Sequence, residues 1–141
     1  MKQRTLAIIK PDAVRKNYTG KIITMITDAG FKILGMKMTK ISKEQAGAFY
    51  EIHKERPFYG ELIEYMSNGS IVPIALEKEN AIDDYRKLIG NTDPTLADAG
   101  SVRKLFGESK AVNAVHGSDS VENGNLEISF FFSRSDLVPN E

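Results

Sequence analysis

The sequence predicts an α/β domain in which short strands alternate with helices. The chain has 141 residues, of which 41% are hydrophobic, and this length can bury one core without crosslinks. Apolar runs and segments of helical spacing follow one another in the order β-α-β-αα-β-α-loop-β-α. The alternation alone favours a parallel sheet with crossover helices, but helix pairs beside short strands also fit a split arrangement with an antiparallel sheet. Periodicity does not choose between the two, and residues 1–141 are interpreted as one domain.

The first three predicted elements are a strand, a helix and a second strand. Residues 5–10, "TLAIIK", form a short apolar run that is stopped by Pro11, as expected of a strand buried on both faces. Residues 20–29 have helical spacing, and Gly30 follows them as a candidate C-terminal cap. Residues 31–38 return to extended character.

Two helices are expected next along the chain. Ser42 and Gln45 have the spacing of a capping box, which predicts a helix through about residue 54. Pro57 is expected to start a second, shorter helix that ends at Asn68 and Gly69.

A strand, a helix and a long loop are predicted in the following segment. Residues 70–76 have the character of a strand, and Asn80 is expected to cap a helix that stops near Gly90. Periodicity fades over residues 91–110, which we interpret as a long loop. Long loops in compact domains often carry function.

The last predicted elements are a short strand and a helix. The strand covers residues 111–115, and Asp119 with Glu122 gives the capping signal of the final helix. That helix contains the unusual segment "ENGN", residues 122–125, whose glycine and asparagines are weak helix formers. We expect this segment to weaken the helix by about 1 kcal/mol or more.

Charge and composition exclude several classes of function. Lysine plus arginine and aspartate plus glutamate both number 19, so the chain has no net charge and no general affinity for nucleic acid or acidic membranes. Any anion site must therefore be local. The sequence has no cysteine, which removes disulfides, thiolate nucleophiles and sulfur-rich zinc sites. No apolar stretch approaches the roughly 20 residues of a membrane span, and we expect a cytoplasmic protein.

Two common phosphate-binding motifs are missing from the sequence. A Walker loop would need a glycine five residues before a Gly-Lys-Ser/Thr, but Gly20 and Lys21 are preceded by Arg15 and followed by Ile22. The glycines also never have the spacing of a dinucleotide-binding turn. If nucleotides bind, other residues hold their phosphates.

His116 is the main candidate for chemistry. It lies in "NAVHGSDS", residues 113–120, between an apolar run and small polar residues. It could be a packed core residue, a metal ligand or a nucleophile. Metal ligation is disfavoured because the only other histidine, His53, has none of the spacings typical of ligand pairs. Imidazole, with an ordinary pKa near ~6.5, is mostly neutral at pH 7 and offers an unprotonated nitrogen, which favours a nucleophile.

A reactive histidine also needs groups that orient its ring. Gly117 would let the chain turn tightly after the histidine, and Ser118 with a carboxylate such as Glu127 could fix the tautomer from behind. Three cations are candidates for an anion site: Lys10 at the end of the first strand, Arg86 on its helix and Arg103 in the long loop. Each could equally be a solvated surface charge.

Five motifs together resemble the nucleoside diphosphate kinase family. They are "IIKPDAV", "HKERPFYGELIEYM", "YRKLIGNTDP", "AGSVRKLFG" and "NAVHGSDS", in the family's order and spacing from about residue 4 to residue 132. The resemblance implies transfer of the γ-phosphoryl group from ATP or another nucleoside triphosphate to a nucleoside diphosphate. It also implies Mg²⁺ carried on the nucleotide phosphates, with no metal ligand from protein side chains, and a phosphohistidine intermediate that gives ping-pong kinetics.

The resemblance assigns a role to each candidate site residue. His116 is the nucleophile, phosphorylated on Nδ1, with Glu127 and Ser118 supporting the far side of its ring. Asn113 bonds the sugar hydroxyls, and Phe58 stacks on the base with Leu62 nearby. The residues expected around the phosphates are Lys10, Tyr50, Arg86, Thr92 and Arg103. We expect loss of either arginine to reduce turnover more than folding.

The family pattern also implies an architecture and an assembly. The implied fold is α/β of the α+β type, a ferredoxin-like sandwich with an antiparallel four-stranded sheet covered by helices. The implied assembly is a homotetramer or homohexamer, and the choice between them is open. No nucleic acid or membrane is required.

Two other functions are compatible with parts of the sequence. "ENGN" lies in the helix that would present Glu127, which leaves open a catalytically silent nucleotide-binding or interaction module of the same fold. A ferredoxin-like RNA-binding domain is disfavoured by zero net charge and by the lack of a basic strand rich in aromatics.

Overall fold

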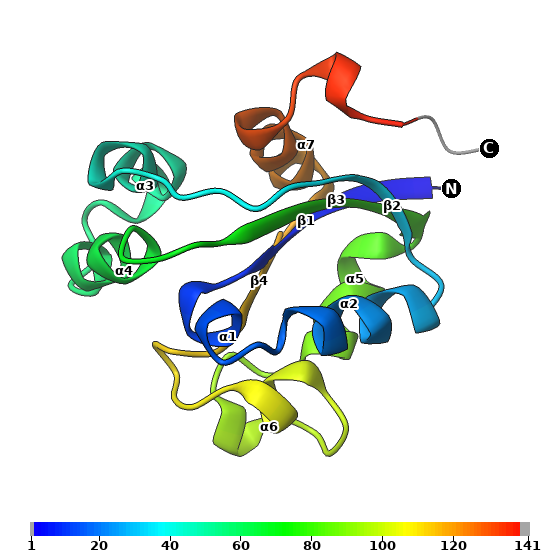
Figure 1. The fold of residues 1–141 in the computed structure, drawn as a ribbon, viewed down its shortest axis with the longest axis horizontal. Helices are drawn as coiled ribbons and strands as arrows, with labels where there is room; N and C mark the ends of the chain where they lie inside the picture. The colour runs from blue at the N-terminus through cyan, green and yellow to red at the C-terminus, as the bar shows by residue number, and fades with distance from the viewer. Residues whose placement is uncertain (1, 139–141) are drawn as a thin grey trace.

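The computed structural model describes residues 2–138, and a four-stranded antiparallel sheet in the order β2-β3-β1-β4 forms its centre (Figure 1). The strands are β1 (Lys2–Ile9), β2 (Lys32–Met36), β3 (Val72–Glu79) and β4 (Val115–Gly117). The helices are α1 (Pro11–Arg15), α2 (Thr19–Asp28), α3 (Lys43–Phe49), α4 (Tyr59–Met66), α5 (Ala81–Ile89), α6 (Val102–Phe106) and α7 (Val121–Phe131). Short 3-10 turns cover Glu51–His53, Pro94–Leu96 and Arg134–Asp136.

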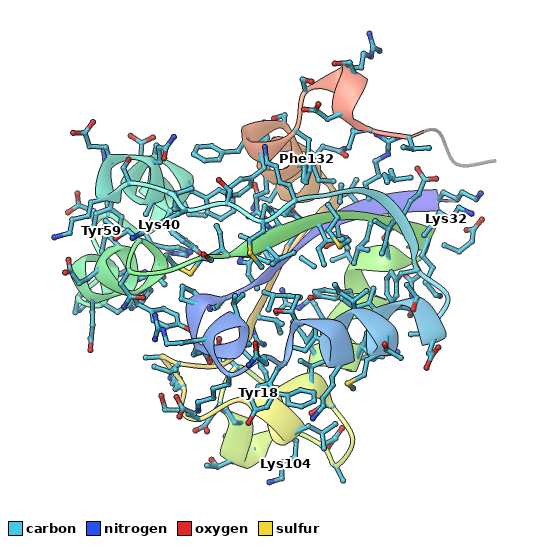
Figure 2. The ribbon with its side chains drawn as sticks, viewed as in Figure 1. Tyr18, Lys32, Lys40, Tyr59, Lys104 and Phe132 are labelled. Atoms are coloured by element: carbon cyan, nitrogen blue, oxygen red, sulfur yellow. The ribbon has the colours of Figure 1, made fainter. Side chains whose placement is uncertain are left out.

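The sheet is buried on both faces, as the apolar run of β1 predicts. Leu6 and Ile8 belong to one core cluster, which also takes residues from α3, α4 and α7. Ala7 and Ile9 point the other way, into a second cluster with residues of α2, α5 and α6. Side chains fill the layers on both sides of the sheet (Figure 2). A strand buried on both faces has no polar alternation, which explains the run "LAII".

The antiparallel, ferredoxin-like architecture implied by the family resemblance is confirmed. β1 pairs antiparallel with both β3 and β4, and β3 pairs antiparallel with β2. The parallel sheet favoured by the alternation of elements is therefore wrong. The prediction failed because strands joined by a helix need not be neighbours in the sheet: a third strand can lie between them. Here β3 lies between β1 and β2, and β1 lies between β3 and β4.

Several local signals in the sequence had their expected effect. Ser42 and Gln45 form the predicted capping box at the start of α3, with the Gln45 amide donating to the Ser42 hydroxyl over 3.0 Å. Gly30 follows α2 with a φ of +91°, the left-handed conformation that favours glycine after a helix. The helix predicted through about residue 54 divides into α3 and the turn Glu51–His53.

Asn80 lies at the N-cap position of α5 as predicted, but it does not cap the helix with its side chain. Its backbone is left-handed, with a φ of 55°, and its side chain makes no capping bond. The Asn80 amide instead donates to Asp84 Oδ1 over 3.2 Å. An asparagine at a strand-to-helix corner tolerates the left-handed region, so here it serves the turn.

Several other elements also differ from the prediction. Residues 91–110 contain helix α6 and a 3-10 turn in addition to loop. The last strand is Val115–Gly117 instead of residues 111–115, and α4 begins at Tyr59, two residues after Pro57. α1 was not predicted, because a helix of 5 residues has too few turns to show a period.

Gly117 has a different purpose from the tight turn predicted for it. A Cβ atom at this position would lie 2.9 Å from ring atoms of Tyr85, and no positive φ is required there. Tyr85 is fully buried on α5, so its ring cannot move aside. The glycine therefore lets α5 pack directly against β4, beside the residue that carries the imidazole.

No helix within residues 2–138 is long and apolar enough to cross a membrane.

Substitution of Gly117 by alanine should destabilise the fold. Because the new methyl would overlap a buried ring, we expect the free energy of unfolding to fall by ~1–3 kcal/mol, the usual cost of overpacking. Urea unfolding followed by circular dichroism measures the change. Gly20→Ala is the control, since a Cβ on α2 at that position would meet nothing within 4 Å. Equal stability of Gly117→Ala and the unmodified chain would contradict this explanation.

Candidate active site

A cleft of about 1410 Å³ brings together nearly all the residues that the sequence predicts for the site. The predicted residues that line it are Lys10, Tyr50, Phe58, Leu62, Arg86, Thr92, Arg103, Asn113, His116 and Glu127. They lie in or directly beside β1, α3, α4, α5, α6, β4 and α7, and in the loop segments around α6. Ser118 is the exception, because its side chain is fully buried behind the cleft.

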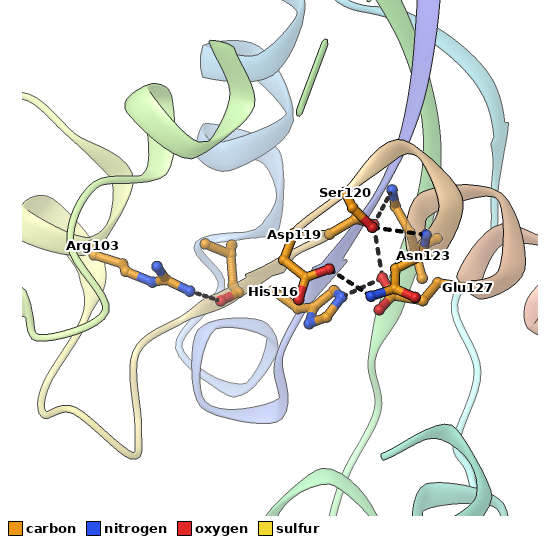
Figure 3. A network of polar contacts seen from close by, with 9 residues as sticks. Arg103, His116, Asp119, Ser120, Asn123 and Glu127 are labelled. Atoms are coloured by element: carbon orange, nitrogen blue, oxygen red, sulfur yellow. Dashed lines mark hydrogen bonds and ion pairs between the residues drawn. The ribbon is translucent and has the colours of Figure 1, made fainter. Parts of the chain in front are cut away.

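The pairing of β4 with β1 fixes the direction of the His116 side chain. His116 lies directly opposite Ile8, so the two side chains point to the same face of the sheet, which is the face covered by α7. The ring nitrogen Nε2 lies 2.8 Å from Glu127 Oε1 (Figure 3). A carboxylate accepts, so Nε2 carries the proton and Nδ1 is left with a lone pair in the neutral ring. In Figure 3 Nδ1 points away from Glu127.

Ser118 supports Glu127 and acts on His116 only through it. The Ser118 hydroxyl donates to Glu127 Oε1 over 2.7 Å, and the same hydroxyl accepts from the backbone amide of Leu6 over 3.0 Å. One carboxylate oxygen therefore receives two hydrogen bonds, from the serine and from the imidazole. This arrangement holds the carboxylate in the orientation that fixes the histidine tautomer.

The "ENGN" segment does not interrupt the helix that carries Glu127. α7 runs from Val121 to Phe131, and a Cβ atom on Gly124 would lie 2.6 Å from the backbone oxygen of Arg4 in β1. The glycine thus permits a close approach of α7 to the sheet, which compensates for its low helix propensity. Ser120, next to Asp119 and expected with it to cap this helix, is the cap, and its hydroxyl accepts from the Asn123 amide over 3.1 Å. Asp119 accepts from the Asn123 side chain over 2.7 Å (Figure 3).

Lys10 is buried in the floor of the cleft, with 7% of its surface exposed. The alternative interpretation of this residue as a solubilising edge charge is therefore wrong. Its ammonium group donates to Asn113 Oδ1 over 2.9 Å. Burial lowers the pKa of Lys10 to about 8, together with the charge of Arg103 and against the opposing charge of Asp12. The cation is therefore held close to its own titration range.

Asn113 is oriented by three hydrogen bonds. Its Nδ2 donates to the carbonyl oxygens of Thr92 and Lys110, at 3.0 and 3.1 Å. Both amide protons are therefore used, and Oδ1 is turned toward Lys10. Towards a ligand this side chain can only accept a hydrogen bond.

Sequence reasoning missed the contribution of Asp12 and Tyr65. Asp12 is buried, and its carboxylate accepts from the Tyr65 hydroxyl and from the Ala114 amide. Burial raises the pKa of this carboxyl, and the charge of Lys10 lowers it. Ala114 has a φ of 73°, a strained conformation for alanine that the Asp12 contact helps to hold. Asp12 belongs to the quoted motif "IIKPDAV", but nothing in the sequence pairs it with residues so distant.

The two arginines differ in their surroundings. Arg103 is buried on α6, and its guanidinium donates to the carbonyl oxygens of Gly90 and Val115 over 3.0 and 2.8 Å. Figure 3 shows its guanidinium pointing toward β4. Its Nε is buried without a partner among residues 2–138. Arg86 is exposed on α5 and lines the cleft. Arg103 is therefore a fixed cation, while Arg86 can move toward a bound anion.

Aromatic side chains form one wall of the cleft. The Tyr50 ring lies 6.2 Å from the imidazole, and its buried hydroxyl has no partner within the described residues. Burial, assisted by the charge of Glu127, raises the pKa of Tyr50, so the group stays a hydroxyl that can donate to a ligand. Phe58 is 46% exposed at the mouth of the cleft, 5.7 Å from the ring of His53. An open aromatic face of this kind can stack on a planar ligand.

Within residues 2–138 no group of three or more histidine, cysteine, aspartate and glutamate side chains could hold a metal ion. The buried charged side chains that line the cleft are instead the cations Lys10 and Arg103. The site is therefore suited to an anion, and any metal ion would have to arrive with that anion.

Comparison with known proteins gives consistent matches over almost the whole chain. The family model for nucleoside diphosphate kinase matches residues 3–137. The nucleoside diphosphate kinase of Chloroherpeton thalassium is 59% identical over 138 residues, which is 98% of each chain. That of Chlorobaculum tepidum is 57% identical over 136 residues, covering 96% of this chain and 97% of the relative.

Solved structures agree with the sequence matches. The Aquifex aeolicus nucleoside diphosphate kinase superposes with a TM-score of 0.97 at 45% identity, covering 98% of this chain and 100% of that one. A halophilic nucleoside diphosphate kinase from Halobacterium salinarum, solved in complex with CDP, superposes with a TM-score of 0.94 at 31% identity. The coverage there is 100% of this chain and 94% of the other.

The charge on Lys10 should make anion binding depend on pH. With a pKa of about 8, Lys10 is protonated below that pH and loses its charge above it. We therefore expect the affinity for a nucleoside triphosphate to fall between pH 8 and 10, by up to about tenfold per pH unit.

Calorimetric titration with ATP across pH 7–10 measures this dependence. Lys10→Gln should bind more weakly at pH 7 and lack the inflection near pH 8. An inflection of equal size in Lys10→Gln would assign the titration to another group.

Proposed function

The chain belongs to the nucleoside diphosphate kinase family, whose reaction transfers the γ-phosphoryl group of a nucleoside triphosphate to a nucleoside diphosphate, and we propose that His116 carries that group between the two nucleotides. The observation that carries the proposal is the bond from Nε2 to Glu127 in a cleft with a cationic floor. This bond leaves Nδ1 as the nitrogen with a free lone pair.

The proposed reaction has two mirror-image steps. In the first, the Nδ1 lone pair forms a bond to the γ-phosphorus while the bond from phosphorus to the β,γ-bridging oxygen breaks and a nucleoside diphosphate leaves. The ring becomes positive as it bonds to phosphorus, and the carboxylate of Glu127 stabilises it through Nε2–H. In the second step an oxygen of an acceptor diphosphate displaces Nδ1 from phosphorus. A single pocket that holds donor and acceptor in turn gives ping-pong kinetics.

Three cations are proposed to surround the transferred group. Lys10 and Arg103 are fixed in the floor by hydrogen bonds to Asn113, Gly90 and Val115, so they need little reorganisation during reaction. Arg86 would close on the phosphates from the exposed side, with Thr92 beside it. Mg²⁺ enters this proposal as part of the substrate, carried on the nucleotide phosphates, where it neutralises charge on their oxygens.

The nucleoside is proposed to lie toward the mouth of the cleft. Phe58 offers an exposed ring face that any base can stack on, with Leu62 beside it, and such stacking is worth roughly 1–3 kcal/mol. Stacking does not require a particular pattern of hydrogen-bond donors and acceptors on the base, so we expect the site to accept different bases. A sugar hydroxyl can donate to Asn113 Oδ1. The amide protons on Nδ2 of the same side chain are already engaged by the carbonyl oxygens of Thr92 and Lys110.

A catalytically silent module of the same fold is not favoured. The segment that motivated it, "ENGN", lies in a continuous helix whose Glu127 contacts both His116 and Ser118. Relatives of 54–59% identity are also named as kinases.

We further propose that the chain works in the cytoplasm as a homotetramer or homohexamer. β2 is an edge of the sheet, and its last residue, Met36, and the nearby Met38 are 48% and 60% exposed. An exposed apolar edge is a typical place for a second copy to pair. Light scattering coupled to gel filtration distinguishes the two assemblies.

Radiolabelled ATP tests the role of His116. Incubation with γ-labelled ATP should leave label on the protein that is labile in acid and stable in base, and added GDP should remove it as labelled GTP. His116→Ala should take up no label, whereas His53→Gln, which removes the other histidine, should still be labelled. Label on His116→Ala, or no transfer by the pure protein, would refute the proposal.

The two arginines should separate catalysis from stability. Loss of one donor that contacts the transition state typically costs roughly 10²–10³ in kcat. We expect a loss of this order from Arg86→Ala without loss of stability, because Arg86 is exposed on α5. Arg103→Ala should also lower the free energy of unfolding by ~1–3 kcal/mol, because the buried carbonyl of Val115 loses its donor. The sequence predicts a larger effect on turnover than on folding for both arginines, and the structure adds a cost in stability for Arg103. Steady-state kinetics and urea unfolding of both variants measure the two effects.

A further inference from the structure

We propose that Phe49 is a positioning residue for phosphoryl transfer, holding the imidazole of His116 in the orientation in which Nε2 meets Glu127. The inference rests on the proposed function, since it concerns the nucleophile of that reaction. It adds a residue to which neither the sequence motifs nor the polar contacts of the site assign a role.

Phe49 has a central place in a cluster of rings. It is the last residue of α3 and lines the cleft. Its ring centroid lies 5.5 Å from that of His116, at an interplanar angle of 69°. The same ring lies 5.2 Å from Phe130 and 5.3 Å from Phe131, both on α7. These distances and tilts are those of favourable edge-to-face contacts.

The contacts to α7 connect Phe49 to Glu127. Phe130 and Phe131 follow Glu127 by three and four residues, so they are its neighbours on one side of the helix. One phenylalanine ring therefore touches the imidazole directly and also packs on the helical turn that presents the carboxylate. It can fix the position of the base relative to the nucleophile.

A single hydrogen bond leaves the imidazole with rotational freedom. The torsion that turns a histidine ring is broad and roughly two-fold, and a half-turn would exchange Nε2 for a carbon atom at Glu127. Aromatic rings packed on the imidazole oppose that half-turn. Tyr50, the residue after Phe49, also packs there, with its ring centroid 6.2 Å from that of His116. Phe49 also covers the partly exposed pair, whose side chains are 14% and 22% accessible, and limits competition from water.

The kinetic test compares Phe49→Leu with Phe49→Tyr. Leucine keeps apolar bulk but removes the ring, so the rate constant for phosphoenzyme formation at saturating ATP should fall roughly 10- to 100-fold, the scale of a small misplacement, with little change in KM. Tyrosine keeps the ring and should retain most of the rate.

A spectroscopic test reads the orientation without any reaction. The chain has two histidines, so ¹⁵N resonances of labelled imidazoles can be assigned with His53→Gln. In the unmodified chain neutral His116 should show a single tautomer with the proton on Nε2. In Phe49→Leu the two nitrogens should move toward averaged shifts.

Phe132→Leu is the matched control for a loss of packing. Phe132 is 5% exposed and follows directly after α7, with Lys37 over its ring at 5.1 Å, but it does not line the cleft (Figure 2). It should lose stability comparable to Phe49→Leu while keeping the phosphorylation rate and the His116 tautomer.

Two results would overturn the inference. One is a normal rate and unchanged tautomer in Phe49→Leu, and the other is an equal kinetic loss in Phe132→Leu. Failure of the proposed function can be told apart from failure of this inference. If the proposed function is wrong, the unmodified protein forms no phosphoenzyme, and the tautomer measurement still decides whether Phe49 orients the ring.

Discussion

The hydrogen bond between His116 and Glu127 is the constraint on which the rest of the site depends. It connects β4, which holds the histidine by pairing with β1, to α7, which holds the glutamate by packing on β1. Gly124 lets that helix approach the Arg4 backbone closely enough for the carboxylate to reach the ring. The absence of a Cβ atom on Gly124 is therefore a condition of the contact.

The site also contains groups whose burial is unfavourable for folding. Lys10 and Arg103 are cations with little exposed surface, and burial lowers the pKa of both. Ala114 has a left-handed backbone between the residues that bind Lys10 and Arg103. Hydrogen bonds stabilise these groups here, and a bound nucleoside triphosphate would supply the negative charge that balances the two cations. The fold thus bears a cost in stability for cations that are already in position when the ligand arrives.

Sequence reasoning succeeded where the signal was local or belonged to a whole motif. The capping box at Ser42 and the glycine after α2 could be predicted because each acts within a few residues. The direction of the strands could be predicted only through the family resemblance, because the alternation of elements says nothing about which strands become neighbours. Asp12 and Phe49 were missed for a related reason: their partners, Ala114 and His116, are distant in sequence, and neither residue type signals such a contact by itself.

The register between β1 and β4 explains why motifs from opposite ends of the chain form one site. Ile8 lies opposite His116, so the next residues on that face are Lys10 on one strand and Ser118 on the other, each two positions along. The backbone amides of Lys10 and Leu6 bond to Ala114 and to the Ser118 hydroxyl, which extends the pairing beyond the ladder at both ends. A slip of one residue would turn His116 toward Tyr85 and away from Glu127. The close fit of Gly117 against Tyr85 opposes that slip, because no side chain can be accommodated there. Packing on one face of β4 therefore secures the position of the nucleophile on the other.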